Sequence, residues 1–252
     1  IQTLNKIAAC GLNQLDRDNY EIASEINNPD AILVRSADMH EMTLSDNVKL
    51  TGTSITFNDS ISDSGTNLLI TSGTSTIFAG STDSTVSASK LVVLAGTLAV
   101  NKTAGTNKIT FNPAATVTSD IIVYNGDVTF SETVSTNGNL TNNSKLTLEK
   151  QTTVDGNFTN SASCTTETKA ELKLSGNFND SGTFTENAGS KITMTGTTAQ
   201  TFTPVATTTY KNINIDKSAG SVSFNTNDLK AAALSDTVAN ASTITFNKTA
   251  TI

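Results

Sequence analysis

The stretch NGNLTNNSKLTLEKQTTVDGNFTNSASCTTETKAELKLSGNFND, residues 137–180, contains one short string three times. The string is Gly-Asn followed by Leu or Phe, and its glycines, Gly138, Gly156 and Gly176, are almost evenly spaced. Between the copies lie short segments in which apolar and polar residues alternate, such as KLTLEK from residue 145 and ELKLSG from residue 171. A period of about 20 residues, with short strands and no helical segment between them, indicates a β-solenoid.

A second string with the same alternation recurs along the chain. It places Ile or Val two residues before Phe, in SITFND, KITFNP, DVTFSE, SVSFNT and TITFNK from residues 54, 108, 127, 221 and 243, and KITMTG from residue 191 is a related case. Because side chains alternate between the two faces of a strand, the apolar pair points to one side and Ser or Thr to the other. We therefore expect inward Ile, Val, Leu and Phe to stack between coils, while outward Thr keeps β propensity.

The expected fold is mainly β: a parallel β-solenoid (β-helix) of about ten coils over residues 50–252, after a short truncated α/β segment over residues 1–49. Ten coils at about 4.8 Å each give a rod of about 48 Å. Gly and Asn are expected at the corners, because they accept left-handed backbone. The repeat is irregular over residues 60–107 and 197–240. A β-sandwich is the alternative, because turn residues spaced about 8 to 12 apart suit that fold as well.

Composition argues against several classes of function. The chain has 252 residues and a net charge of -7. A nucleic-acid partner is not expected, because phosphate binding needs a surplus of Lys and Arg. No run of about twenty apolar residues is present, so no membrane span is expected. No signal peptide is recognised at Ile1, so a surface role would need an export signal or an anchor outside these residues.

The first 49 residues differ in character from the rest. They hold 12 of the 39 charged residues, both arginines and the only histidine, and the change falls near Lys49 to Gly52. Strands are expected in IQTLNKI (1–7) and AILVRS (31–36), a turn or short helix in AACGLNQL (8–15), and a second strand or edge segment in DNYEIASEI (18–26). A turn is expected at NNPD (27–30), and a helix start in MHEMTLSDNVK (39–49).

The strings IQTLNKI, YEIASEINNPDAILVRSADMHEM and DNVK resemble the N-terminus of D-3-phosphoglycerate dehydrogenase, of the D-isomer-specific 2-hydroxyacid dehydrogenase family. The resemblance covers residues 1–49 and implies that Arg35 and Ser36 would lie near the acid groups of the substrate. The chain lacks the G-x-G-x-x-G turn that holds a dinucleotide, and no Arg or His follows His40. The substrate positions are therefore expected to be vestigial, with no catalytic residues, no cofactor and no metal.

The repeats of residues 50–252 resemble the β-helical passenger regions of bacterial autotransporters and filamentous-haemagglutinin-like surface proteins, most clearly in TTTYKNINIDKSAGSVSFNT (207–226). This resemblance implies a structural or adhesive segment without catalysis, at the bacterial cell surface or secreted, whose partners are an unknown surface ligand or neighbouring solenoid segments. One alternative is an NAD-dependent D-3-phosphoglycerate dehydrogenase of serine biosynthesis in the cytoplasm, as residues 1–49 suggest. Further alternatives are an ice-binding solenoid and an artificial join of two unrelated genes.

Several residues of types that could act in catalysis, metal binding or glycosylation have simpler structural interpretations. His40, beside Glu41, is expected to be a surface residue and not a general base. Cys10 and Cys164 are too few for a zinc site and are expected to be free and partly buried. Asp155, Asp180 and Asp216 are expected to be solvated turn carboxylates rather than calcium ligands, because the calcium-binding G-G-x-G-x-D repeat is absent. Chance explains the N-x-[ST] triplets at Asn101, Asn139, Asn157 and Asn247.

Pairs of the form T-x-T raise the ice-binding alternative, because a flat, regular Thr array can order water. They occur as TGT from residue 51, TST from 74, and TFT from 183 and 201. The pairs do not recur at one coil spacing, which weakens this alternative.

Overall fold

The computed structural model describes residues 1–252 except 5, 28, 30, 35–48, 63–66 and 238–242. The chain forms two compact units, unit one over Ile1–Asp46 and unit two over Asn47–Ile252. Arg35, Ser36 and His40 lie outside the described residues, as does the helix start expected in residues 39–49 except for its last residue.

Unit one contains a pair of parallel strands and one short helix. The elements are β1 (Gln2–Leu4), α1 (Ala9–Leu12) and β2 (Ile32–Val34), and Gln2 lies opposite Ile32. The strand expected over residues 18–26 is reduced to one bridge between Ala23 and Gln2. Asp and Glu disfavour strands, and this segment contains three of them, so its pairing ends after a single residue.

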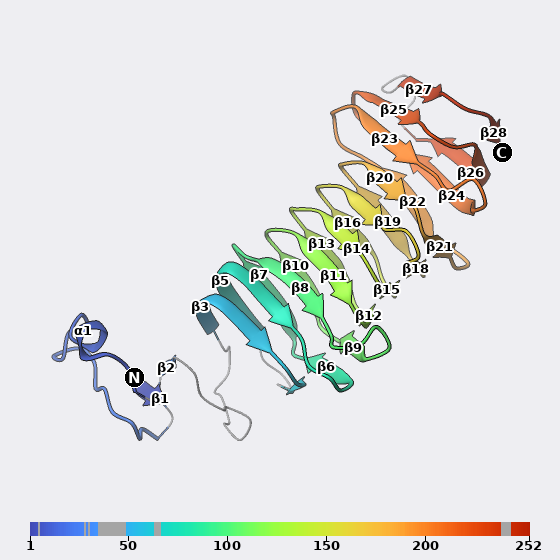
Figure 1. Cartoon of the computed structure of the whole chain (residues 1–252). Coiled ribbons are helices and arrows are strands. Elements are labelled where there is room, and N and C mark those ends of the chain that lie inside the picture. Colours follow the sequence, from blue (N-terminus) through green and yellow to red (C-terminus); the bar gives the residue numbers. More distant parts are fainter. Residues whose placement is uncertain (5, 28, 30, 35–48, 63–66, 238–242) are drawn as a thin grey trace. The chain divides into compact units, whose positions relative to one another are not determined.

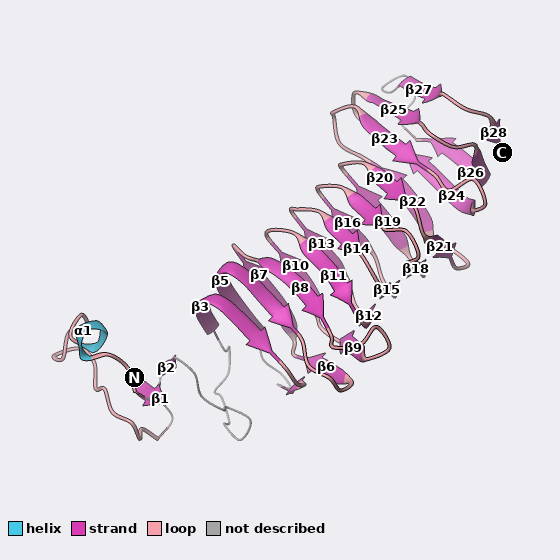
Figure 2. Cartoon of the chain, viewed as in Figure 1, coloured by secondary structure: helices cyan, strands magenta, loops and turns pink. Residues whose placement is uncertain are grey.

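Unit two is a parallel β-solenoid of about nine coils, in which each coil lies on the one before it (Figures 1 and 2). Every strand pairing within its described residues is parallel. The expected solenoid is confirmed and the β-sandwich alternative is wrong, because a sandwich is built from antiparallel pairs.

A complete coil contributes one strand to each of three faces. The first face contains β7 (Lys90–Leu94), β10 (Ala114–Val117), β13 (Val134–Thr136), β16 (Thr152–Val154), β19 (Glu171–Leu174) and β22 (Lys191–Met194). The second face contains β8 (Thr97–Asn101), β11 (Ile121–Asn125), β14 (Leu140–Asn142), β17 (Phe158–Asn160), β20 (Phe178–Asp180), β23 (Gln200–Thr203), β25 (Ser221–Phe224) and β27 (Thr243–Phe246). The third face contains β4 (Ile61–Ser62), β6 (Ser84–Ser87), β9 (Lys108–Phe111), β12 (Asp127–Phe130), β15 (Lys145–Leu148), β18 (Thr165–Thr168) and β21 (Thr183–Glu186).

The coils at both ends of unit two use longer strands that turn a corner. Near the start, β3 (Lys49–Phe57) and β5 (Asn67–Phe78) each run along the first and second faces. Near the end, β24 (Thr209–Ile215) pairs with β22 of the first face, and its Tyr210 packs against Phe184 of the third. β26 (Leu229–Asp236) follows β24, and β28 (Ala250–Thr251) pairs with β26.

Coil length explains where the sequence repeat is clear and where it is irregular. In the middle of unit two, Val134 pairs with Thr152 and Thr152 with Leu172, so successive coils are nearly equal in length. Earlier in the chain, Leu91 pairs with Ala115, and the coil between them is longer. The extra residues enter the corners and leave the strand alternation intact, so the strands remain recognisable while the period does not.

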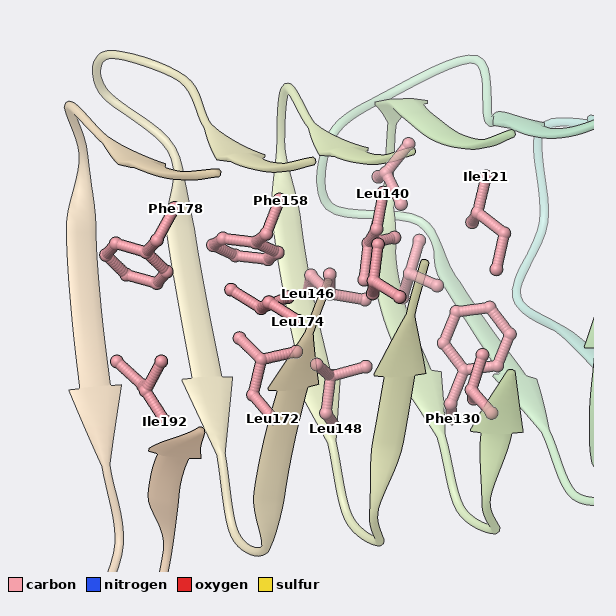
Figure 3. Packing of buried hydrophobic residues seen from close by; sticks show 14 of the residues in the cluster. Ile121, Phe130, Leu140, Leu146, Leu148, Phe158, Leu172, Leu174, Phe178 and Ile192 are labelled. Carbon is pink, nitrogen blue, oxygen red and sulfur yellow. The ribbon is translucent and has the colours of Figure 1, made fainter. Parts of the chain in front are cut away.

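The core is a stack of equivalent side chains. Along the second face, Ile121, Leu140, Phe158 and Phe178 follow one another from coil to coil, and Ile192 and Leu172 stack opposite them (Figure 3). The Phe158 and Phe178 rings are stacked with centroids 5.3 Å apart. This packing is the inward stacking that the alternation predicts, and it fills the interior with few aromatic residues.

The Gly-Asn corners have a different cause from the one expected. Gly138, Gly156 and Gly176 are not among the described residues with positive φ, so left-handed backbone does not explain them. A Cβ on Gly156 would lie 2.6 Å from the carbonyl oxygen of Gly138, because these corners stack backbone on backbone. Asn139 and Asn157 join the corners, each accepting at Oδ1 a hydrogen bond of 2.8 Å from the backbone N–H one coil on.

We predict that Gly156→Ala lowers the free energy of unfolding by about 1 to 3 kcal/mol, because the added methyl group overpacks the corner. Gly73→Ala is the matched control, since its Cβ would find Thr53 Cα only at 3.7 Å, an ordinary contact. Its effect is expected within about 0.5 kcal/mol. Urea unfolding of both variants measures the difference, and equal effects would contradict the steric account.

Candidate functional site

The two cysteines have different environments. Both are free, as expected, but neither is partly buried: Cys10 is exposed and Cys164 is buried. Burial raises the pKa of the Cys164 thiol. A buried thiol with a raised pKa is a poor nucleophile, because the thiolate is the reactive form.

The T-x-T pairs do not share a surface. Thr183 and Thr185 lie on the third face, whereas Thr201 and Thr203 lie on the second. In TST the second threonine, Thr76, is fully buried. The third face does have a column of outward threonines, Thr85, Thr110, Thr129 and Thr147, which Glu167 interrupts. The pairs that raised the ice-binding alternative therefore do not build one flat array.

Of the three aspartates expected in solvated turns, one is placed differently. Asp155 is exposed and Asp216 is half-buried, but Asp180 is only 2% exposed. The expectation is wrong for Asp180 because it ends β20 at an inward position, one coil above Asn160. It belongs to a column of polar side chains inside the solenoid.

This column, here called the inner polar ladder, consists of Asn142, Asn160, Asp180 and Tyr210. The Asn142 amide donates to Asn160 Oδ1 at 3.1 Å, and the Asn160 amide donates to Asp180 Oδ1 at 2.9 Å. The Tyr210 hydroxyl donates to Asp180 Oδ2 at 2.8 Å. All four side chains are buried, so each hydrogen bond joins one coil to another in the absence of water.

The inner polar ladder also satisfies the backbone of the turn between the second and third faces. The Asn142 amide donates to the carbonyl oxygen of Thr165 at 2.9 Å, and the Asn160 amide donates to that of Thr183 at 3.1 Å. The N–H of Gly182 donates to Asp180 Oδ1 at 3.1 Å. Buried backbone groups that leave the sheet pairing at a corner need such partners, because an unmade buried hydrogen bond is costly.

The Asp180 carboxyl group of the inner polar ladder is buried. Burial raises the pKa of the Asp180 carboxyl, although hydrogen bonds from Asn160, Tyr210 and Gly182 act in the opposite direction. Burial, together with the negative charge of Asp180, raises the pKa of Tyr210 as well. Glu186, which accepts from the backbone N–H of Lys211, is a second carboxyl whose pKa is raised by burial.

The sequence analysis did not predict the inner polar ladder, although strand alternation indicates it. The strings LTN, FTN and FND end at residues 142, 160 and 180, two positions after an inward Leu or Phe. Strict alternation therefore predicts Asn, Asn and Asp on the inner face as well. General preference for surface Asn and Asp argued for solvation, and in this case the alternation is the better guide.

Two buried lysines donate hydrogen bonds to backbone carbonyl groups at other corners. Lys217 is fully buried, and its Nζ donates to the carbonyl oxygen of Thr198 at 2.8 Å and to Gln200 Oε1 at 2.6 Å. Lys102 Nζ donates to the carbonyl oxygen of Ala79 at 2.6 Å. Burial lowers the pKa of both ammonium groups. No feature of the sequence marks these lysines, because the strands on which alternation depends end before them.

The outer surface of unit two has a shallow groove among its described residues that a ligand could contact. It lies on the first face, has a volume of about 310 Å³, and is lined by Lys90, Ala114, Ala115, Thr116, Thr133, Val134, Ser135, Gln151 and Thr153. Hydroxyl groups, one amide and one ammonium dominate this lining. Unit one has a separate hollow of about 390 Å³ beside Ile1 and Tyr20.

The described residues contain no group of three or more His, Cys, Asp or Glu side chains that could hold a metal ion. Within the same residues, no helix is long and apolar enough to cross a membrane. Asn139 and Asn157, in two of the N-x-[ST] triplets, use their side-chain oxygens in corner hydrogen bonds. Comparisons with protein-family models, curated proteins and solved structures find no match to this chain.

We predict that Asn160→Leu lowers the free energy of unfolding by about 3 kcal/mol, because it leaves a carbonyl group and part of a carboxylate without a buried donor. Asn143→Leu is the matched control: Asn143 is exposed and accepts a hydrogen bond from the Ser161 hydroxyl. Its effect is expected within about 0.5 kcal/mol. Urea unfolding distinguishes the two variants, and a neutral Asn160→Leu would contradict the structural role of the ladder.

The raised carboxyl pKa values predict a pH dependence of stability. Between the ordinary pKa of Asp180, 3.8, and its raised value in the folded protein, the unfolded chain binds fewer protons than the folded one. The free energy of unfolding should therefore fall as pH rises through this window. Asp180→Asn should flatten the dependence, because it removes the carboxyl group whose pKa burial raises. Urea unfolding across the acidic range measures the slope, and an unaltered slope in Asp180→Asn would refute the assignment.

Proposed function

We propose that unit two is a structural rod segment, of the stalk or passenger type found in bacterial surface and secreted proteins. The observation that supports this proposal is the inner polar ladder. Its polar groups join coil to coil and point toward one another, where a catalytic or ligand site would direct them toward a cavity. Among the described residues, every buried side-chain nitrogen or oxygen atom has a hydrogen-bond partner.

The design of the coils supports a mechanical role. Each coil contacts the next through backbone pairing and stacked apolar side chains, and the hydrogen bonds of the inner polar ladder join the middle coils in addition. Contacts along a solenoid are made between neighbouring coils. Inter-coil ion pairs add to this on the surface, with Lys145 Nζ 2.7 Å from Asp127 Oδ2 and Lys169 Nζ 2.7 Å from Glu149 Oε1. These exposed pairs contribute little stability individually but favour the in-register stack.

Adhesion would be the second part of this role. The groove on the first face offers hydroxyls, an amide and an ammonium, which suit a polar or acidic ligand presented along the rod. The unit one resemblance to a dehydrogenase has no such support in geometry, because Arg35 and Ser36 lie outside the described residues.

Duplication of a coil tests the structural role. Residues 152–171 form one coil, because Thr152 pairs with Leu172. Three extra copies inserted after residue 171 should fold and lengthen the rod by about 14 Å, at about 4.8 Å per coil. Small-angle X-ray scattering measures the length. The control is an insert of the same composition in shuffled order, and loss of folding with both inserts would overturn the modular rod.

Antibody labelling of the cells that make the protein tests its location. An antibody raised against unit two should label intact cells as strongly as permeabilised ones. Labelling only after permeabilisation would overturn the surface proposal and leave the rod structure itself unaffected.

A further inference from the structure

The sheet of the third face ends at β21, within the continuously described residues 67–237. Among the described pairings, β21 pairs with β18 in the coil below it. In the next coil, a turn at residues 206–207 and the first residues of β24 take the place of a third-face strand. The described pairing of β24 with the coil below begins only at Ile213. Residues 204–212, here called the joint segment, therefore need other contacts to that coil.

Two buried carboxyl groups supply these contacts. Asp180 is 2% exposed and Glu186 is 5% exposed. The Tyr210 hydroxyl donates to Asp180 Oδ2 at 2.8 Å. The backbone N–H of Lys211 donates to Glu186 Oε2 at 2.6 Å, and that of Asn212 donates to Glu186 Oε1 at 3.4 Å. Carboxyl oxygens thus hold the joint segment where the pairing between coils is interrupted.

The titratable groups that face these two carboxyl groups come from β24. Asp180 faces the Tyr210 hydroxyl, and Glu186 faces the exposed side chain of Lys211. Burial and the charges of both carboxyl groups raise the pKa of Tyr210, which therefore stays protonated. In the coil below, β17 and β18 place the neutral side chains of an asparagine and a threonine beside them. Burial is the largest influence on Asp180 and Glu186 and raises the pKa of each, so the closed structure favours the protonated acids.

We propose that the joint segment and the two carboxyl groups form an acid-stabilised joint, closed while Asp180 and Glu186 are protonated and opened locally as they lose their protons. Opening exposes both groups to water, where the charged form is favoured, so the open state binds fewer protons than the closed state. The population of the open state therefore rises as pH rises from the ordinary pKa values, 3.8 and 4.5, through the raised values of the closed protein.

The first and second faces stay paired while the joint is open. β22 pairs with β24 from Ile213 onward, and β20 pairs with β23, without either carboxyl group. Opening is thus confined to the third-face side of one coil, where the solenoid becomes more flexible without separating. The inference adds pH control to the proposed rod function and rests on that function only for its use.

Amide hydrogen exchange of the full chain across the acidic range, corrected for the intrinsic effect of pH on exchange, tests the joint. Protection of the N–H groups of Val205, Lys211 and Asn212 should fall as pH rises, by up to about tenfold per pH unit for each carboxyl group. The N–H groups of Asn157 and Asn177, which donate to uncharged asparagine oxygens, report opening of the whole stack. They should stay at least about tenfold better protected. Equal protection of the two sets, or protection of the joint segment that does not change with pH, would overturn the proposal.

Substitutions separate titration from structural contact. Asp180→Asn combined with Glu186→Gln replaces both acids by neutral side chains of nearly the same shape and should remove the pH dependence of protection in the joint segment. Tyr210→Phe removes a hydroxyl donor but keeps both acids, so protection should fall at every pH while the pH dependence remains. A pH dependence that persists in the double variant would overturn the assignment, and the wild-type measurement decides if that variant does not fold. A joint segment that stays closed at every pH would leave the length and labelling tests of the proposed function unaffected.

Discussion

Parallel backbone hydrogen bonding between coils is the constraint on which the rest of unit two depends. It fixes the distance between coils at about 4.8 Å, so every residue must tolerate its equivalent directly above and below it. Phe158 and Phe178 meet this condition by ring stacking, and Gly138 and Gly156 by having no side chain at all. Asn139 meets it with an oxygen that accepts from the next coil. The repeated Gly-Asn-Phe string follows from this single distance between coils, because each of its three adjacent residues must stack on its equivalent in the next coil.

Buried polar groups in this protein stabilise the stack and restrict its register. The inner polar ladder places Asn160 between Asn142 and Asp180, and a slip of one residue would turn all three toward solvent. Apolar stacking alone tolerates exchange of Leu for Phe and discriminates registers weakly. The inner polar ladder thus adds directional hydrogen bonds that the apolar core lacks. The need to fix one register explains why this narrow core retains buried Asn and Asp.

The strands of the middle coils of unit two have more pairing partners than those of its first and last described coils. In the middle coils each strand has neighbours on both sides, whereas β3 and β27 have described partners on one side only. Solenoids need terminal coils that end the stack, because an open strand edge with exposed apolar residues templates further pairing.

The sequence alone determined the solenoid class, the parallel stacking and the inward set of Ile, Val, Leu and Phe, because strand alternation and a regular coil period are local properties. The same alternation points Asn142, Asn160 and Asp180 inward, but the general preference of Asn and Asp for the surface led to the wrong expectation of a solvated Asp180. Only the tertiary structure decided which face each strand joins: the similar strings KITF from 108 and TITF from 243 lie on the third and second faces. It also decided that Gly156 serves close approach, that Asp180 meets Tyr210, and that Lys217 is buried. These outcomes depend on corner lengths and on contacts between residues distant in the chain, which no local pattern records.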